Sequence, residues 1–519
     1  MFGKMWSAAL YGVDARIVHV EVDIASGLPQ VNVVGLPDAA IRESVERMRA
    51  AIRNCGWKFP MERITINLAP ADLRKEGTSF DLAMTIAVLT TSKQLEQAHF
   101  ANTFIVGELA LDGQTRPIPG ILSLIDEAQR NGFKRVLVPA ENAAEALLVG
   151  GIEVYALSHL TQLRQEYDSN DGHLLDHLLQ TNQQEQGARI SVGDRNEVSL
   201  REDYADIVGH VHVKRAMTIA AAGMHNIILS GAPGTGKTML IRRLPTILPP
   251  LNEKEALEVS KIYSVSGKWD RHSEQLMNTR PFRSPHHSIS AAGLIGGGSI
   301  PKPGEVSLAH RGVLFLDELP EFQRPALEAL RQPLEDRSVT IARARAVFCF
   351  PAHVMLAASM NPCSCGFHGG SQQRCQCSAF KLQQYRARLS GPLLDRIDLQ
   401  VDVPRLPLHE WDQPSMTSAT MRSQVMEAQA RQHARYKQLP ISFNSELNGV
   451  WLKRFSRLDT EAAHMLRQAY EMLGLSLRAH DRLLKLARTI ADVEHSEQIH
   501  APHIAEAIQY RSLDRPITH

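Results

Sequence analysis

The sequence has few cysteines, no long apolar run and almost no excess of charge, and each absence excludes a class of protein. There are six cysteines in 519 residues, four of them close together, which argues against a disulfide framework and favours a reducing compartment. No stretch approaches the roughly 18 consecutive apolar residues that a membrane-spanning helix needs. A formal net charge of +1 means that any contact with a polyanion must come from local basic patches.

The first ten residues, MFGKMWSAAL, also lack the basic segment, apolar core and cleavage site of a secretory leader. We therefore expect a cytoplasmic protein with no membrane partner. Hydrophobic residues make up 44% and charged residues 22% of the chain, which is typical of soluble globular proteins. The length is too great for one hydrophobic core, so about three domains of ~150 residues are expected.

The clearest chemical pattern is Asn226–Thr238, which reads NIILSGAPGTGKT. A short strand, Ile227–Ser230, leads into the pattern G-x-x-x-x-G-K-T. In such a loop the backbone N–H groups surround phosphates, Lys237 reaches the β- and γ-phosphates, and the Thr238 hydroxyl holds Mg²⁺. A helix starting near Lys237 adds the positive end of its dipole. The predicted ATP-binding residues are Gly231, Ala232, Pro233, Gly234, Thr235, Gly236, Lys237 and Thr238.

Two further apolar stretches end in polar residues. Val313–Leu316 is followed by Asp317 and Glu318, and a buried strand that delivers acids at its carboxyl end is the usual location of a nucleotide site. We expect Asp317 to hold Mg²⁺ through water and Glu318 to orient and activate the attacking water. The third strand, Val354–Ser359, leads to Asn361, which is expected to position the same water.

Two arginines are candidates for contacting the γ-phosphate. The segment around Arg396, SGPLLDRID, resembles the part of ring ATPases that offers an arginine finger to the next subunit. The alternative is a weak surface ion pair with Asp395 or Asp398. Arg478 begins a predicted helix where a second sensor arginine would lie, with Arg482 one turn on as the backup. Each could instead be a solvated helix arginine.

The segment ahead of the phosphate loop contains Ile207 and Val208, which are candidates for packing on the adenine; plain core packing is the alternative. Two insertions are candidates for contacting nucleic acid. The first, residues 281–312, contains Arg283, Lys302 and a glycine run, and the second, residues 331–350, is a predicted hairpin with Arg343 and Arg345 near its tip. Arginines at such a tip can hold backbone phosphates, and an ordinary solvated hairpin is the alternative.

Four cysteines lie within fifteen positions and are the candidate metal ligands. They form two Cys-x-Cys pairs, which suit tetrahedral Zn²⁺, with His368 as a possible substitute ligand and free cytosolic thiols as the alternative. A catalytic metal is not expected because four thiolates leave no open position. The proposed ligands are Cys363, Cys365, Cys375 and Cys377.

Residues 1–165 have an α/β pattern, and the segments KEGTSFDLAM and GELALDGQTRPIPGILSLIDEAQRNGFKRVLVPAEN resemble the proteolytic domain of the Lon family. That family uses a serine–lysine dyad, and Ser79 lies where the nucleophile would be. The stretch Ile121–Ile125 contains no lysine, and a serine without a base is a poor nucleophile. We therefore expect a Lon-like domain without peptidase chemistry, in which Ser79 is a helix N-cap.

The segments FRSPHHSIS, PGEVSLAHRGVLFLDE and LEALRQPLED resemble magnesium-chelatase-like AAA+ ATPases, and with the first domain the resemblance extends to the ComM/YifB competence family. It implies a homohexameric, ATP-dependent DNA motor that drives branch migration of single-stranded or branched DNA with recombination proteins. A metal-chelatase motor subunit and an ATP-dependent protease-like remodeller are the alternatives.

The expected fold class is α/β with three domains. They are a Lon-like α+β domain over residues 1–165, a P-loop AAA+ core over 200–405 and a C-terminal helical lid over 406–519. Residues 166–199 are rich in polar residues and are expected to be a flexible linker. The predicted ligands are ATP, Mg²⁺ and Zn²⁺.

Overall fold

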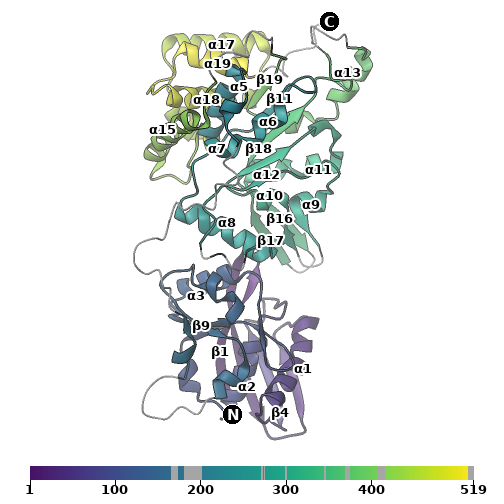
Figure 1. The fold of residues 1–519 in the computed structure, drawn as a ribbon, viewed down its shortest axis with the longest axis vertical. Coiled ribbons are helices and arrows are strands. Elements are labelled where there is room, and N and C mark those ends of the chain that lie inside the picture. Colours follow the sequence, from purple (N-terminus) through teal and green to yellow (C-terminus); the bar gives the residue numbers. More distant parts are fainter. Residues whose placement is uncertain are drawn as a thin grey trace. The chain divides into compact units, whose positions relative to one another are not determined.

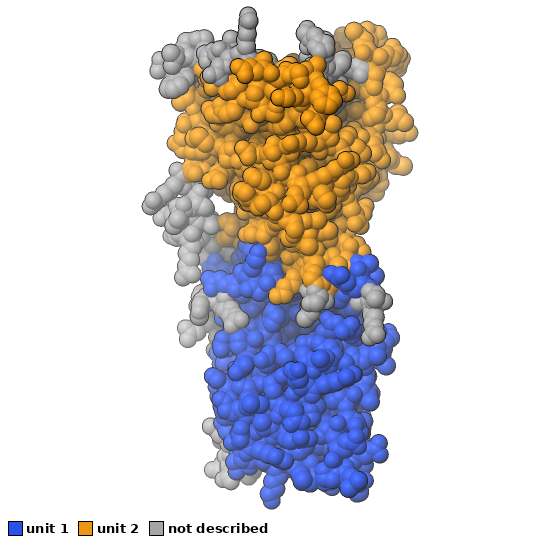
Figure 2. Space-filling model, turned by 90° about the vertical axis from the view of Figure 1, so that its right-hand side faces the viewer, with its two compact units in different colours: residues 1–192, 256–277, 342–350 blue, residues 193–255, 278–341, 351–519 orange. Residues whose placement is uncertain are grey.

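The computed structural model of the chain describes residues 1–164, 174–180, 202–270, 273, 275–298, 301–343, 346–368, 375–406 and 415–511. The chain forms two compact units, coloured blue and orange in Figure 2. Unit 1 contains residues 1–192, 256–277 and 342–350, and unit 2 contains residues 193–255, 278–341 and 351–519.

This division differs from a series of three consecutive domains in two ways. Residues 406–519, predicted as a separate lid, share unit 2 with the core. Two segments of the predicted core, 256–277 and 342–350, are grouped with the N-terminal unit. The second of these segments contains the end of the first strand and most of the second strand of the hairpin that was proposed to contact nucleic acid.

Unit 1 is built on a mixed eight-stranded sheet of order β10-β9-β8-β5-β1-β2-β4-β3. Figure 1 labels β1, β4 and β9 of this sheet. The centre of the sheet is a long antiparallel hairpin in which β1 pairs with β2 along its whole length. A smaller hairpin, β6–β7, lies outside the sheet. The strands are β1 Phe2–Tyr11, β2 Asp14–Ala25, β3 Gln30–Val34, β4 Arg63–Ala69, β5 Thr103–Ile105, β6 Glu108–Leu109, β7 Thr115–Arg116, β8 Arg135–Pro139, β9 Glu153–Leu157 and β10 Leu179–Gln180.

Two hydrophobic clusters cover opposite faces of this sheet because side chains alternate along each strand. Met5 and Ala9 of β1 pack with the helices α1 and α2, whereas Ala8 packs with α3. Every residue of α2 is buried, and α1 is capped by Asp38, whose carboxylate accepts a hydrogen bond from the backbone N–H of Ile41 at 2.9 Å. The helices are α1 Ala39–Asn54, α2 Asp81–Thr91, α3 Ile121–Arg130 and α4 Ala143–Ala146.

Two expectations for this region were wrong. Ser79 is not a helix cap: α2 begins at Asp81, and its N-cap residue is Phe80, which makes no side-chain capping bond. The backbone carbonyl of Ser79 instead accepts a hydrogen bond from Gly107 N–H at 2.9 Å. Within the predicted linker 166–199, residues 174–180 are not a flexible connection, because Leu174, Leu175 and Leu178 are buried in the core of unit 1 and β10 pairs with β9. The rest of the predicted linker lies outside the described residues.

Unit 2 contains a five-stranded parallel sheet of order β12-β15-β18-β11-β19. β11 and β15 are buried throughout and are predicted correctly from their apolar runs. β18 lies between them, so the strand that precedes the phosphate loop and the strand that precedes the acids each have β18 as a neighbour. The strands are β11 Ile227–Ser230, β12 Phe282–Arg283, β15 Val313–Leu316, β18 Met355–Met360 and β19 Leu399–Asp402.

The insertions contain short elements, of which residues 342–350 belong to unit 1 and the others to unit 2. The first folds into a helix, α9, and a small hairpin, β13–β14, and the second contains the β16–β17 hairpin. The short elements are α6 Lys237–Arg242, α7 Leu244–Ile247, α9 Ala291–Ile295, β13 Gly296–Gly297, β14 Lys302–Pro303, α10 Glu305–Leu308, α11 Arg324–Ala329, α12 Arg331–Asp336, β16 Ser338–Arg343, β17 Ala346–Pro351, α13 Ala379–Arg386 and α14 Gly391–Leu394.

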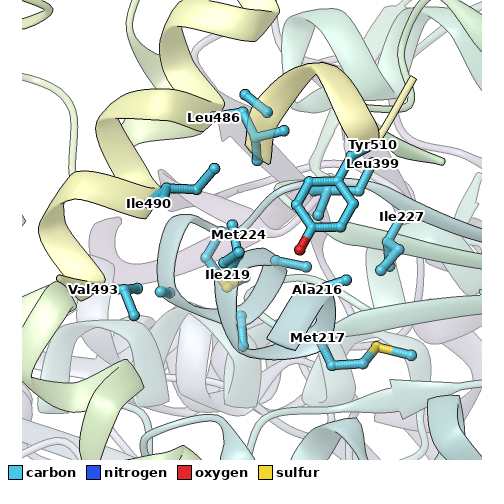
Figure 3. Close-up of a cluster of buried hydrophobic side chains, with 14 of the residues drawn as sticks. Ala216, Met217, Ile219, Met224, Ile227, Leu399, Leu486, Ile490, Val493 and Tyr510 are labelled. Carbon is cyan, nitrogen blue, oxygen red and sulfur yellow. The ribbon is translucent and has the colours of Figure 1, made fainter. Parts of the chain in front are cut away.

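The C-terminal helices join the core through α5. Figure 3 shows Met217 and Ile219 of α5 in one buried cluster with Ile227 of β11 and with Leu486 and Ile490 of α18. Two of the C-terminal helices, α17 and α18, span the ranges that their apolar periodicity predicts. The longer helices are α5 Val211–Gly223, α8 Glu253–Ser266, α15 Ser418–Tyr436, α16 Gly449–Phe455, α17 Thr460–Leu473, α18 Leu477–Val493 and α19 Ala501–Gln509. Among the described residues, no helix has both the length and the apolar character needed to cross a membrane.

A buried ion network fixes α18 against α15. The carboxylate of Asp492 accepts hydrogen bonds from Arg435 at 2.9 Å, Arg488 at 2.9 Å and Asn444 at 2.8 Å. Asp492 and Arg488 are almost fully buried. Removing the carboxylate leaves two guanidinium groups without their shared counter-charge.

We expect Asp492→Ala to lower the free energy of unfolding by about 3–5 kcal/mol, because the loss of one partner leaves uncompensated buried charge. Urea denaturation measures this change. The control is Glu471→Ala, which removes an exposed carboxylate from α17 and should change stability by less than about 0.5 kcal/mol. Equal stability of the two variants would contradict a structural role for the network.

Candidate nucleotide-binding site

The polar residues predicted from three separate strands meet at one edge of the unit 2 sheet. The phosphate loop follows β11, the acids Asp317 and Glu318 follow β15, and Asn361 follows β18. These strands are parallel and adjacent, so their carboxyl ends lie together. Hydrogen bonds join Thr238 of the loop region to Asp317, and Lys237 to Asn361.

A hydrogen bond joins the phosphate loop to the first acid. Thr238 Oγ1 donates to Asp317 Oδ2 at 3.0 Å, and Ser359 Oγ donates to the other carboxylate oxygen, Oδ1. A hydroxyl beside a carboxylate is a set of hard oxygen donors, which suits Mg²⁺ bound through one or two protein groups and water. Thr238 and Asp317 therefore fit the predicted magnesium site. Ser359 was missed as a functional residue because it lies inside an otherwise apolar strand.

The ammonium group of Lys237 lies inside the loop that surrounds it. Its Nζ donates to the carbonyl oxygens of Gly231 at 2.7 Å and Ala232 at 2.9 Å, and to Asn361 Oδ1 at 3.3 Å. Burial lowers the pKa of Lys237, and the nearby carboxylates of Asp317 and Glu318 counter part of that shift. A buried cation with oxygen ligands is suited to exchange those ligands for phosphate oxygens. Asn361 is thus already in contact with the residue that would bind the γ-phosphate.

Glu318 has a backbone conformation that is unusual for its residue type. Its φ is 54°, in the left-handed region, and its N–H donates to Ser359 Oγ at 3.3 Å. The side chain is 57% exposed, so it points to solvent rather than into the core. His287, from the first insertion, lies 3.9 Å from Glu318 Oε2. Backbone strain at a solvent-facing acid that follows β15 fits a residue that is held in position to activate the attacking water. The contact between His287 and Glu318 joins segments far apart in the chain, so no local pattern indicates it.

The residues proposed for the adenine divide into two environments. Ile207 is 7% exposed and belongs to the main hydrophobic cluster of unit 2. This environment agrees with core packing, the alternative to a contact with adenine. Val208 is half-buried and lies outside that cluster. Of the two, Val208 has the surface that a base could contact.

The predicted finger, Arg396, and the predicted sensor, Arg478, both line a cavity of about 390 Å³ at the opposite end of the sheet. The cavity includes Asn226, which precedes β11, whereas the phosphate loop follows that strand; at ~3.3 Å per residue the two ends are roughly 15 Å apart. Neither Arg396 nor Arg478 therefore lies at the phosphate loop of its own chain. The basic residues that line the cavity are Arg337, Arg396, Arg478, Arg482 and Lys485, and the acidic ones are Glu335, Asp398, Glu446 and Asp481.

Arg396 is held in this cavity by two acceptors. Its guanidinium donates to the carbonyl oxygen of Pro392 at 2.6 Å and to the Glu335 carboxylate, while its Nε is buried without a partner. The ion pair is with Glu335 rather than with either of the two aspartates weighed from the sequence. An unsatisfied buried N–H is costly, so the group has unused capacity for an anionic ligand.

Asp398, in the wall of the cavity, is a buried carboxylate that pairs with His225 and Arg482. Burial opposes its ionisation, but the hydrogen bond and charge of His225, together with Arg482 and Lys485, hold the pKa of Asp398 at about 2. Arg482 Nε lies 3.7 Å from this carboxylate. The contact indicates a structural role for Arg482 and leaves Arg478 as the sensor candidate.

The basic residues of the two insertions have different surroundings. Arg283 is paired with Glu305 through two hydrogen bonds of 2.6 and 2.9 Å, so its guanidinium stabilises the insertion from within. Lys302, on β14, and Arg343, on β16, are exposed. Arg345 lies outside the described residues. Lys302 and Arg343 thus expose their side chains, whereas the guanidinium of Arg283 is bound within the insertion.

The four cysteines predicted as metal ligands are brought together. Their sulfur atoms all lie within 4.8 Å of one another. Cys363 Sγ is 3.3 Å from that of Cys365 and 3.7 Å from that of Cys375, and the last two are 3.6 Å apart. Four thiolates at ~2.3 Å from a tetrahedral Zn²⁺ have edges of about 3.8 Å, so the donor set fits zinc. His368 is not part of this group among the described residues.

The N-terminal unit has no serine–lysine pair at the predicted dyad position, since the corresponding stretch of α3 contains no lysine. Lys75, four residues before Ser79, is fully buried, and its ammonium donates to the carbonyl oxygen of Pro70. Burial lowers the pKa of Lys75, and Asp72 opposes this effect.

Three family profiles match consecutive parts of the chain. Residues 203–411 match the family described as magnesium chelatase, subunit ChlI, and residues 415–511 match the C-terminal part of the same subunit. Residues 20–142 match a family described as subunit ChlI of Mg-chelatase. Together they cover most of the described residues of both units.

Full-length relatives extend this likeness. The chain is 42% identical over 520 residues to YifB of Salmonella typhimurium, and 42% identical over 515 residues to the competence protein ComM of Haemophilus influenzae; each alignment covers 98% of this chain and 97% of the relative. Shorter similarities are 26% over 177 residues to Lon protease 2 of Bacillus subtilis and 34% over 85 residues to the DNA repair protein RadA of Pseudomonas aeruginosa.

The geometry predicts different losses for two substitutions at the site. Lys237→Ala removes the buried cation and should abolish both ATP binding and turnover. Glu318→Gln keeps the fold and the loop, so it should bind ATP normally but lower kcat at least ~100-fold, as expected for loss of a general base. Binding of a fluorescent ATP analogue and phosphate release measure the two effects.

The matched control is Glu321→Gln, the same change three residues further on, at an exposed carboxylate that pairs with Arg388. It should leave kcat unchanged. Wild-type turnover in Glu318→Gln would remove Glu318 from the reaction.

Proposed function

Because this chain belongs to the ComM and YifB family of magnesium-chelatase-like AAA+ proteins, which implies ATPase activity with ATP and Mg²⁺, we propose that it is a DNA motor working as a homohexameric ring. The observation that carries the ring is the separation between the phosphate loop and Arg396 in one protomer. An arginine that serves a γ-phosphate from the far end of its own sheet must serve the nucleotide of a neighbour.

The cavity around Arg396 supports this sharing. Arg478 lines the same cavity, so one protomer presents both arginines together. In this arrangement Arg478 acts on the neighbour's triphosphate alongside Arg396, rather than on the nucleotide of its own chain as a closing lid would. Glu335 balances the charge of Arg396 until a phosphate replaces it.

A mixing experiment tests the shared site. Arg396→Ala and Lys237→Ala should each lack ATPase activity, with a loss of roughly 10³-fold or more for the arginine. Mixed rings should regain activity, because an intact loop from the first variant meets an intact Arg396 from the second. Phosphate release by the mixture measures the recovery.

The control mixture combines Lys237→Ala with Glu318→Gln. Both residues serve the nucleotide of their own chain, so this pair should recover nothing. An inactive mixture of the Arg396 and Lys237 variants, in rings shown to contain both, would contradict a role for Arg396 between subunits.

DNA is the proposed polymer because one full-length relative is named for competence and a partial one for DNA repair. The proposed contacts are the exposed Lys302 and Arg343, together with Arg345. Single-stranded or branched DNA, handled with recombination proteins, is the substrate class that fits branch migration. Zn²⁺ at the four cysteines completes the proposed set of ligands.

Arg343→Ala with Arg345→Ala should weaken binding to forked DNA and reduce the slope of log affinity against log salt by about two, since each phosphate contact releases about one counterion. Fluorescence anisotropy at several salt concentrations measures the slope. The control, Arg431→Ala with Arg467→Ala, removes the same charge from exposed positions on α15 and α17, and it should leave the salt slope unchanged. Equal slopes in both double variants would exclude the hairpin from the DNA path.

A chelatase motor subunit is the second candidate, because all three family profiles are described by that subunit. It would use the same ATP site to remodel a partner that inserts a metal into a tetrapyrrole. Stimulation of the ATPase by forked DNA supports the DNA motor, whereas stimulation only by a chelatase partner supports the second candidate. Stimulation by unfolded protein would indicate a protease-like remodeller.

A further inference from the structure

The four-cysteine cluster lies directly beside the residues that would handle the γ-phosphate. Cys363 is two positions after Asn361, whose amide oxygen accepts a hydrogen bond from Lys237. Cys363 is fully buried just after the end of β18, and the other three cysteines are partly buried. Any group that fixes Cys363 therefore also limits the movement of Asn361.

A second contact joins the cysteine loop to the phosphate loop itself. Gly366 has a φ of 85°, and its N–H donates to the carbonyl oxygen of Cys363 at 3.0 Å. A Cβ atom at Gly366 would lie 2.6 Å from Cδ and 2.8 Å from Cγ of Pro233. The two loops thus touch at a position that only glycine satisfies, both for its conformation and for space.

A third contact comes from the helix that follows the last cysteine. Ser378 caps α13 immediately after Cys377. Tyr385 of α13 is buried; burial raises its pKa to about 12, and a hydrogen bond from the backbone N–H of Asn361 offsets part of that rise. The cysteines therefore connect two elements that contact Asn361 from different parts of the chain.

We propose that Zn²⁺ bound by Cys363, Cys365, Cys375 and Cys377 locks Asn361 and Pro233 in position, so that ATP hydrolysis, rather than ATP binding, depends on the metal. This inference rests on the ATPase activity in the proposed function. Four thiolates are soft donors, which select zinc over the magnesium of the neighbouring site. The metal centre has a positioning role, since its four protein ligands leave no position for water or substrate.

The first experiment uses the full-length wild-type protein. Elemental analysis should find about one zinc per chain and no iron, and the absorption spectrum should lack the visible bands of an iron–sulfur cluster. Displacement of the metal by a mercurial reagent should release zinc to a chromogenic chelator. The same reagent should lower the basal, DNA-independent kcat at least ~10-fold and change the affinity for a fluorescent ATP analogue less than ~3-fold, because small displacements at a site affect chemistry most.

Two variants separate the metal from the contact that it supports. Cys375→Ser should lose zinc and kcat together, whereas Cys349→Ser, which changes an exposed thiol outside the cluster, should lose neither. Gly366→Ala keeps all four ligands, so it should retain zinc but lose kcat through its clash with Pro233. Its control is Gly267→Ala, at a glycine with a φ of 72° where an added Cβ atom would meet nothing within 4 Å, and this variant should keep full kcat.

The outcomes distinguish this inference from the proposed function. Protein without zinc that hydrolyses ATP normally, or zinc-depleted protein with unchanged kcat, would overturn the inference alone. A parallel loss of ATP affinity and kcat on zinc release would show that the metal supports the fold of the whole loop, which also overturns it. Absence of ATPase activity in zinc-loaded wild-type protein would instead overturn the proposed function.

Discussion

The hydrogen bond between Thr238 and Asp317 is the constraint on which the rest of the site depends. It joins Thr238 of α6, which follows the phosphate loop after β11, to Asp317, which follows β15. The parallel pairing of β11 and β15 with the intervening strand β18 brings these two segments to the same edge of the sheet. Ser359 of β18 supports the hydrogen bond from the other side of the carboxylate. The magnesium site therefore depends on the pairing of the buried strands, because this pairing brings the oxygen donors for Mg²⁺ together.

The two ends of the same sheet have different electrostatic character. At the carboxyl end, one buried lysine faces two acids and an amide within the phosphate loop. At the amino end, a cluster of arginines lies among acidic residues. Within that cluster, the buried Nε of Arg396 has no hydrogen-bond acceptor. The predicted phosphate site and the cationic groups of the cavity therefore lie at opposite ends of the sheet, which is the separation that the proposed sharing of a site between subunits starts from.

The sequence was sufficient for the features with strong local signals. The phosphate loop, the apolar runs of β11 and β15 and the periodic helices α17 and α18 follow from patterns that short windows contain. It was insufficient where tertiary contacts decide the outcome. Ser359 reads as one polar residue in an apolar strand, and the contact of His287 with Glu318 joins distant segments.

The errors have the same origin. The polar composition around residues 174–180 indicates a linker. Three of its leucines nevertheless pack into the hydrophobic core of unit 1, and this long-range contact has no local sequence signal. The Ser79 hydroxyl has the residue type of an N-cap, but the turn before α2 brings Phe80 to that position instead. Helix position also gives no information about the surroundings of Arg478, which lines the same cavity as Arg396 because of the packing of α18.

Unit 1 is not formed by one continuous stretch of the chain. A domain attached by one linker would contribute one continuous segment, but six consecutive segments of the chain alternate between the two units. Within unit 1, Lys261 pairs with Asp126 of α3, and Phe348 of β17 stacks on Tyr11 with ring centres 5.1 Å apart. Residues inserted into the ATPase core thus contribute side chains to the N-terminal unit. The ion pair and the stacked rings are therefore part of the packing of unit 1, although Lys261 and Phe348 belong to segments that lie within the ATPase core in the sequence.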